Sequence, residues 1–400
     1  MNKKKISIIL MFFIAVLSTF VFVKNNSNVE ITNEVNNKSK KNRNLLTMNL
    51  EQTAGAGDYK TVTQSEWPTD EYEFNKELSK CENGSKLSWD DTKKVVVVSG
   101  NLSDKCYVYF DIARFDKLCN TSTLACHVAK LYTGTQGENG IYYHNTSLTN
   151  GAGDNNYRYA GANPNNYICL GSDATTCPDD NLFRIIGVFG GKVKVIRDKS
   201  VVKMHWDTSN YNTWSISSLN TYLNGTYLTS IGTLSDKIDM ATWKVGGNTW
   251  DNISVSTAKE VYDYEIKNPS TTASTGETEY NAKIGLMYVS DYMFAVLQNN
   301  WTLVAYNSND ATKDYRAVKA ENWLYLGSDE YTITRSSKYS FEVYAIYSSG
   351  EVYSYSVSCG SGEPLPCSVY AKYARPSFYL ISSVEYSGGT GTSSDPIRIK

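Results

Sequence analysis

Residues 182–197 read LFRIIGVFGGKVKVIR, and this stretch decides the fold of the larger part of the chain. Two runs rich in β-forming residues flank Gly190 and Gly191, a dipeptide that tolerates positive φ and so favours a tight hairpin turn. The stretch therefore predicts an antiparallel β-hairpin. A hairpin of this kind needs further strands or helices to bury its apolar side chains, and these must come from the flanking sequence.

The segment that follows the hairpin predicts a helix. Between residues 214 and 224, Ile216, Leu219 and Leu223 recur at helical spacing. We expect an amphipathic helix that packs its apolar side on the sheet.

Two later segments extend the sheet. Residues 283–297 predict a strand that runs into a short helix capped by Ser290. Residues 339–347 and 351–357 predict a second hairpin around a Ser-Ser-Gly turn.

The N-terminus predicts a membrane segment. Residues 6–23 read ISIILMFFIAVLSTFVFV, which is close to the ~20 residues that cross a bilayer core. Lys3, Lys4 and Lys5 precede the run and place the N-terminus in the cytoplasm, so the body after Lys24 is expected outside the cell. A cleaved signal peptide is the alternative, but no A-x-A-like site follows the run.

Composition and turn signals divide the rest of the chain. We predict a transmembrane signal-anchor at 1–24, a polar flexible stalk at 25–59, a small β-module at 60–115, a connector at 116–140 and a large domain at 141–400. The strands of the small module are expected around Trp89, the valine run 95–98 and residues 106–110.

The 8 cysteines are even in number and all follow the apolar run. Outside the cell such a set is typical of disulfides. Because the cysteines fall in local couples, we predict Cys81–Cys106, Cys119–Cys126, Cys169–Cys177 and Cys359–Cys367. The alternative is a metal site, but no C-x-x-C occurs and the 3 histidines stand at no recognised ligand spacing.

The overall charge gives no reason to expect a nucleic-acid partner. The formal net charge is -2, so no strong field attracts phosphate. The 31 tyrosines suit β-sheets whose outer faces meet water, and they also suit binding surfaces. Trp243, Trp250, Trp301 and Trp323 could stack on sugars or anchor a protein interface, although we expect most of them in the core and Trp323 above all.

Adjacent polar residues do not define a catalytic site. Turn and capping roles account for Asp179-Asp180 and Ser290-Asp291. His205-Trp206-Asp207 lacks a nucleophile in any recognised context, so no catalytic residue is predicted.

Residues 151–156 have the oxygen-rich, glycine-broken composition of a calcium loop without the spacing of an EF-hand. A plain turn is the expected role, and calcium is the one cofactor that the sequence leaves open.

The order of several motifs resembles a known domain. These motifs are the 182–187 hairpin strand, the 214–224 helix, residues 284–292, Trp323-Leu324 and the terminal 375–380 segment. Together they resemble a C-type-lectin-like domain of unknown function that recurs in surface proteins of low-GC Gram-positive bacteria, and the small module resembles a β-domain that accompanies it. The resemblance implies an α+β fold with short helices on a curved antiparallel sheet and loops suited to recognition. The related formylglycine-generating enzymes are not matched, because their Gly-Gly-Ser-Trp segment and catalytic cysteines are missing.

The expected protein is α+β: a transmembrane helix, a small β-sandwich-like module and a C-type-lectin-like domain. We expect a membrane-anchored recognition protein of the bacterial cell surface. Its partners would be the lipid bilayer, through residues 6–23, and an extracellular glycan or protein. The alternatives are a cell-envelope enzyme whose site is assembled from distant residues and a purely structural envelope component.

Overall fold

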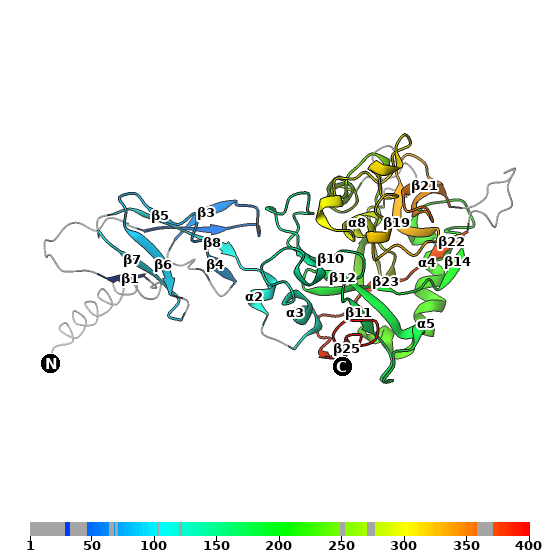
Figure 1. The fold of residues 1–400 in the computed structure, drawn as a ribbon, viewed down its shortest axis with the longest axis horizontal. Helices are drawn as coiled ribbons and strands as arrows, with labels where there is room; N and C mark the ends of the chain where they lie inside the picture. The colour runs from blue at the N-terminus through cyan, green and yellow to red at the C-terminus, as the bar shows by residue number, and fades with distance from the viewer. Residues whose placement is uncertain are drawn as a thin grey trace, which may run out of the picture. The chain divides into compact units, whose positions relative to one another are not determined.

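The computed structural model describes residues 29–32, 46–63, 68, 71–90, 92–101, 104–119, 122–248, 253–269, 277–357 and 371–400. The chain forms two compact units, Met1–Leu118 and Cys119–Lys400, and each is described by itself (Figure 1).

The smaller unit consists of two sheets around one apolar core. One sheet has the order β3-β2-β8-β4, with β5 also paired to β8, and the other has the order β1-β7-β6. The core contains Met48, Leu50, Val96, Val108 and Phe110. The strands are β1 (Val29–Thr32), β2 (Leu46–Glu51), β3 (Tyr59–Val62), β4 (Tyr72–Phe74), β5 (Lys80–Cys81), β6 (Lys86–Asp90), β7 (Val95–Ser99) and β8 (Cys106–Ile112).

Strand β8 shows why this unit folds as it does. Its buried residues alternate with partly exposed ones, so Cys106, Val108 and Phe110 all point into the core. A disulfide joins Cys106 to Cys81, which lies directly opposite on β5.

The smaller unit begins earlier in the chain than we predicted. Strand β2 lies in the range 25–59 that we predicted as a flexible stalk, yet it pairs with both β3 and β8. Its residues Met48 and Leu50 belong to the core, and polar neighbours hid this apolar alternation.

The larger unit contains the predicted hairpin at its centre. Strands β12 (Leu182–Phe189) and β13 (Lys192–Arg197) pair antiparallel, and both turn glycines have positive φ, 54° at Gly190 and 75° at Gly191. Strand β12 bulges between Ile185 and Gly187. A Cβ at Gly187 would lie 1.9 Å from the carbonyl oxygen of Tyr157, so only glycine lets the neighbouring strand approach.

This hairpin belongs to a seven-stranded sheet with the order β18-β23-β13-β12-β10-β9, in which β11 also pairs with β12. The added strands are β9 (Ile141–Tyr143), β10 (Tyr157–Tyr159), β11 (Tyr167–Cys169), β18 (Ile284–Gly285) and β23 (Ser377–Tyr379).

A six-stranded sheet has the order β14-β22-β19-β20-β21, with β16 paired to β19. Its strands are β14 (Val202–Met204), β16 (Gly247–Asn248), β19 (Glu330–Ser336), β20 (Glu342–Ile346), β21 (Val352–Ser356) and β22 (Lys372–Ala374). Every residue of β19 is buried, and β20 and β21 form the second predicted hairpin. The remaining described strands of the larger unit form two antiparallel pairs. Strand β15 (Ala241–Lys244) pairs with β17 (Glu279–Ala282), and β24 (Tyr386–Gly388) pairs with β25 (Arg398–Ile399).

The helices are short. The α-helices are α2 (Phe115–Leu118), α3 (Leu124–Ala129), α4 (Ser218–Tyr222), α5 (Leu228–Ser230), α7 (Ala258–Tyr262) and α8 (Val289–Phe294). Two π-helical segments continue α4 and α7, η5 (Leu223–Tyr227) and η7 (Asp263–Lys267). The 3-10 turns are η2 (Glu138–Gly140), η3 (Asp179–Asn181), η4 (Trp214–Ile216), η6 (Gly232–Lys237), η8 (Gln298–Asn300), η9 (Ala311–Lys313) and η10 (Lys319–Glu321).

Two helix predictions are wrong in detail. Leu219 and Leu223 are buried, but Ile216 is 61% exposed because the α-helix begins at Ser218, after a separate 3-10 turn. The residue that precedes α8 as its N-cap is Tyr288, and Ser290 already lies inside the helix.

The predicted fold class is also wrong. Among the described residues 33% are in strands and only 20% in helices, so this part of the chain is mainly β, whereas we predicted an α+β fold with a C-type-lectin-like domain. The pieces that looked helical in sequence are one- or two-turn segments between strands. No helix in the described ranges has the length and apolar character to cross a membrane. The predicted anchor, residues 6–23, lies outside the described residues.

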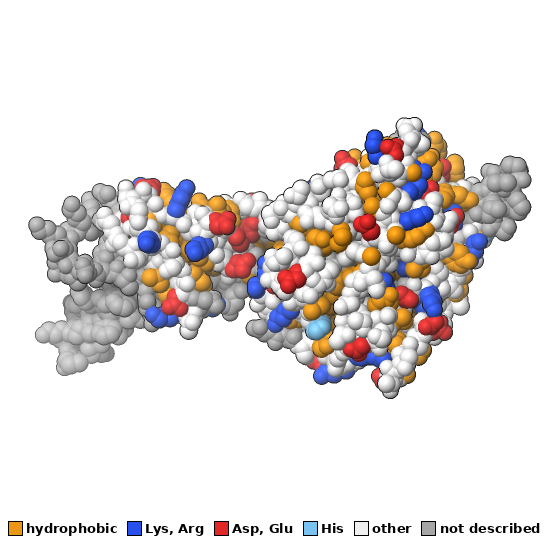
Figure 2. Space-filling view, viewed as in Figure 1, with side chains coloured by type: hydrophobic (Ala, Val, Ile, Leu, Met, Phe, Trp, Pro, Cys, Tyr) orange, Lys and Arg blue, Asp and Glu red, His pale blue; other side chains and the backbone are white. Residues whose placement is uncertain are grey.

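The surface carries both signs of charge. Figure 2 shows basic and acidic side chains interspersed over the visible face of each unit, with small groups of apolar side chains between them. On this face, therefore, attraction of ligands by charge must come from local groups.

We predict that the Cys81–Cys106 bridge stabilises the smaller unit by about 3 kcal/mol, since it closes a loop across a sequence separation of 25 in a unit with a small core. Replacing both cysteines by alanine should accelerate amide hydrogen exchange in β7 and β8. The matched control is the same double replacement at Cys169 and Cys177, which should leave β7 and β8 protected. Equal protection of these strands in both variants would show that the bridge contributes little.

Candidate functional site

The acidic residues of the two polar pairs that the sequence singles out, Asp179-Asp180 and Ser290-Asp291, have structural roles. Asp179 and Asp180 form exposed ion pairs with Lys199 and Arg197. Asp291 is buried, accepts the backbone N–H of Tyr288 at 2.8 Å, and forms an ion pair with Lys194.

His205 and Asp207 do not form a catalytic couple. The carboxylate of Asp207 accepts the backbone N–H groups of Ser209, Tyr211 and Ser218. These bonds shape the turn before α4. The hydrogen bonds of Asp207 therefore account for a turn.

The loop at residues 151–156 uses its one carboxylate internally. Both oxygens of Asp154 are bound by the guanidinium of Arg158, and Oδ2 also accepts the hydroxyl of Tyr262 at 2.8 Å. Burial alone would raise the pKa of Asp154, but the Arg158 charge outweighs it and lowers the pKa. In the described part of the chain, no group of three or more histidine, cysteine, aspartate or glutamate side chains is placed to hold a metal ion.

The described tryptophans of the predicted stacking group lie in the core. Trp243, Trp301 and Trp323 are at most 3% exposed. Their indole N–H groups donate to the carbonyls of Ala282, Val296 and Tyr159. The burial of Trp323 was predicted. Because all three tryptophans are buried, none of them can present a ring face to a ligand. Trp250 lies outside the described residues.

The cysteines of the described ranges all form disulfides. The bridges are Cys81–Cys106, Cys119–Cys126 and Cys169–Cys177, which are three of the four predicted pairs. Cys359 and Cys367 lie outside the described residues. The bonded thiols are not available as nucleophiles or metal ligands.

A buried ionic cluster surrounds the N-terminus of α8, which lies close to β19 in Figure 1. Glu265 accepts the N–H groups of Val289 and Ser290, each at 3.0 Å, and also the hydroxyl of Thr334 on β19. Asp291 pairs with Lys194 of β13, and both side chains are at most 5% exposed.

Glu265 is the most perturbed carboxyl of this cluster. Burial raises its pKa to about 7, although the N–H groups of the helix and the Thr334 hydroxyl favour the charged form. A carboxyl with such a pKa suits acid–base chemistry. However, none of the four hollows described in the structure includes Glu265 in its lining, and the residue is only 2% exposed.

One accessible hollow is a groove lined by two tyrosines. It has a volume of about 540 Å³, and its lining contains Tyr306, Tyr353, Val255 and the loop Asn307-Ser308-Asn309. The two rings meet edge to face with centroids 5.1 Å apart. We call this hollow the tyrosine groove.

An ion pair behind the tyrosine groove fixes the positions of its lining residues. Asp314 is fully buried and binds the guanidinium of Arg316 through both carboxylate oxygens. Arg316 also donates to the carbonyl of Asn307 and lies 5.0 Å from the ring centroid of Tyr306. Tyr306 and the loop therefore have fixed positions before any ligand arrives.

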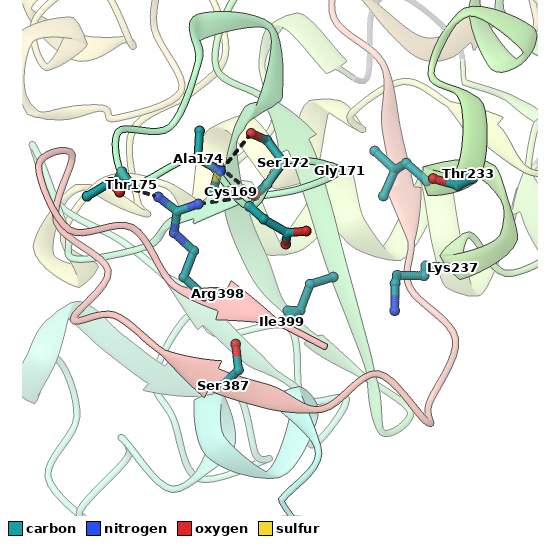
Figure 3. Close-up of a pocket in the computed structure, with 12 residues that line it drawn as sticks. Cys169, Gly171, Ser172, Ala174, Thr175, Thr233, Lys237, Ser387, Arg398 and Ile399 are labelled. Atoms are coloured by element: carbon teal, nitrogen blue, oxygen red, sulfur yellow. Dashed lines mark hydrogen bonds between the residues drawn. The ribbon is translucent and has the colours of Figure 1, made fainter.

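A second accessible hollow lies beside the Cys169–Cys177 bridge. It has a volume of about 470 Å³ and is lined by three segments far apart in sequence: loop 169–175, η6 and the β24–β25 hairpin (Figure 3). We call it the stapled hollow.

Comparison of the chain with protein-family models, with curated proteins and with solved structures finds no match. The candidate sites therefore rest on the chemistry of their own side chains.

The sequence did not predict either hollow. Tyr306 and Tyr353 are two among 31 tyrosines, and no spacing marks them as partners. The available signal was the turn-forming run Asn307-Ser308-Asn309-Asp310 next to a tyrosine, since loops of this composition often carry binding residues.

We predict that ionisation of Glu265 destabilises the larger unit. The folded pKa of about 7 exceeds the usual value of 4.5, so protonation favours the folded state, and stability falls as pH rises between these values. The full effect is on the order of 3 kcal/mol. The melting temperature of the wild type minus that of Glu265→Gln should therefore be larger at pH 5 than at pH 8.

The comparison with the variant is needed because His144 opposes this trend. Burial lowers the pKa of His144, so its contribution destabilises the fold as pH falls below its usual value of 6.5. Both proteins contain His144, and the difference between them removes its effect. A difference in melting temperature that does not change with pH would contradict the assignment.

Proposed function

We propose that this protein is a recognition protein of the cell exterior that binds a neutral saccharide in the tyrosine groove. The observation that carries the proposal is the chemistry of the groove: two tyrosine rings, amide and hydroxyl groups, and no charged side chain among its lining residues.

Each part of this lining matches a part of a sugar. The apolar C–H face of a pyranose can pack against the rings of Tyr306 and Tyr353, and Val255 adds an apolar rim that is 67% exposed. The side-chain oxygen of Asn307 accepts two backbone N–H groups of its own loop, at 3.0 and 3.1 Å. This leaves the Asn307 amide N–H groups to donate to sugar hydroxyls, with Ser308 and Asn309 exposed beside it.

The uncharged lining and the fixed shape favour this ligand over others. A neutral ligand has no charge whose favourable interaction with water would be lost when it enters the groove. The volume of the groove, about 540 Å³, lies within the usual range for small-molecule sites. A proline-rich peptide also docks on aromatic side chains, but it needs parallel ridges of rings, and these two rings cross at 66°.

Export supports a recognition role. Three disulfides in the described residues are typical of an oxidising exterior. We propose that residues 6–23 hold the chain in the membrane with the body outside, as the basic flank before them indicates.

A cell-envelope enzyme is the competing function. Its best candidate group is Glu265, which is sealed beneath α8 as described above. Recognition therefore has the stronger support, because its groups are accessible.

We predict that the full-length chain binds neutral glycans on an array and that Tyr306→Ala weakens this binding about tenfold or more. The loss of one buried aromatic contact is worth about 1.4 kcal/mol or more at such a site. The protein should be dissolved in a polyoxyethylene detergent, because this detergent carries no sugar head group.

Tyr211→Ala is the matched control, since Tyr211 is 47% exposed and lies outside the groove. It should bind as the wild type does. An array without reproducible glycan hits would contradict the proposal, and so would competition by a polyproline peptide but not by free sugar.

A further inference from the structure

The stapled hollow is rigid before any ligand enters. The Cys169–Cys177 bridge closes its loop. From the opposite side Arg398 of β25 extends toward this loop and donates to the carbonyls of Ser172 and Thr175, at 3.2 and 3.1 Å (Figure 3). The loop is therefore fixed at both ends and in its middle.

The hollow contains two cations without a carboxylate partner. Arg398 is bound to neutral carbonyl groups, and the half-buried Lys237 has no ion pair with any described acidic residue. Figure 3 places Lys237 at one side of the hollow and Arg398 at the other, with Ile399 between them and Ser387 below Arg398.

This arrangement differs from that of the other cations on the adjoining segments. Those cations are neutralised in the pairs Lys192–Asp239, Arg197–Asp180, Lys199–Asp179 and Lys400–Glu385. At the hollow the two cations, Lys237 and Arg398, outnumber the one acidic lining residue, Asp173, so a ligand can supply negative charge there.

We propose that the stapled hollow binds the carboxylate of a small hydroxylated organic acid, at a site separate from the tyrosine groove. Lys237 attracts the carboxylate as a point charge, and Arg398 adds a second positive charge nearby. The hydroxyls of Ser387 and Thr233 face the polar remainder of the ligand, while Ile399 supports its carbon skeleton.

The volume and the one acidic lining residue narrow the ligand class. About 470 Å³ is far more than a single inorganic ion fills, so an organic body accompanies the charge. Asp173 is the acidic member of the lining, and its negative charge opposes a second anionic group. A monocarboxylate therefore fits better than a phosphate dianion.

Glucuronate and glucose provide a matched pair of probes, because the carboxylate is the difference between them. Titration calorimetry of the full-length chain, in the polyoxyethylene detergent and at low salt, should detect glucuronate at millimolar concentrations. Lys237→Gln should weaken this binding at least tenfold. Lys130→Gln is the control, since Lys130 is also exposed and loses the same charge outside the hollow.

The Tyr306→Ala variant separates this site from the tyrosine groove. Glucuronate should bind this variant as it binds the wild type, whether or not the groove binds glycans. The assignment is overturned if glucuronate does not bind, if glucose binds the Tyr306→Ala variant as well as glucuronate does, or if inorganic phosphate binds more tightly. It is also overturned if Lys237→Gln binds glucuronate as tightly as the wild type does, with an unchanged melting temperature that shows the variant to be folded.

Discussion

Buried side chains that accept the N–H groups at the N-terminus of helix α8 hold the larger unit together. The first N–H groups of α8 need acceptors, and Glu265 and Asp291 supply them from within the core. Lys194 neutralises Asp291 from one sheet, and Thr334 binds Glu265 from the other. Removal of either Lys194 or Asp291 would leave a buried charge without its partner, which typically costs 3–5 kcal/mol. The two sheets therefore share a single polar junction.

This junction explains why the buried charges are poor candidates for chemistry. Asp154 with Arg158, and Glu330 with Arg375, are likewise paired inside the protein. Each of these charges is satisfied by a partner inside the protein. The accessible groups lie on loops, where a second set of contacts fixes them: Asp314 with Arg316 behind the tyrosine groove, and a disulfide with Arg398 around the stapled hollow.

The sequence revealed features that depend on neighbours along the chain. Gly190-Gly191 marks a turn by itself, and cysteines seven or eight residues apart in the sequence form bridges across short loops. Features set by distant residues were missed. Ile216 has helical spacing but precedes the helix, and Met48 and Leu50 become core only because β8 pairs with β2. The wrong fold class came from the resemblance to a lectin-like domain, which implied an α+β fold, whereas the described residues are mainly β.

The two hollows were beyond sequence reasoning for a related physical reason. Tyr306 and Tyr353, like Lys237 and Arg398, are far apart in the sequence and are brought together only by the folding of the chain. A lysine or tyrosine on the surface is ordinary until its partners are known, because most such residues are merely solvated. What distinguishes Lys237 is that it forms no ion pair with a described acidic residue and shares its hollow with a second cation, Arg398. What distinguishes Tyr306 is that a buried Asp314 holds Arg316 against its ring. Each site is thus defined by interactions around the binding group, and these exist only in the folded chain.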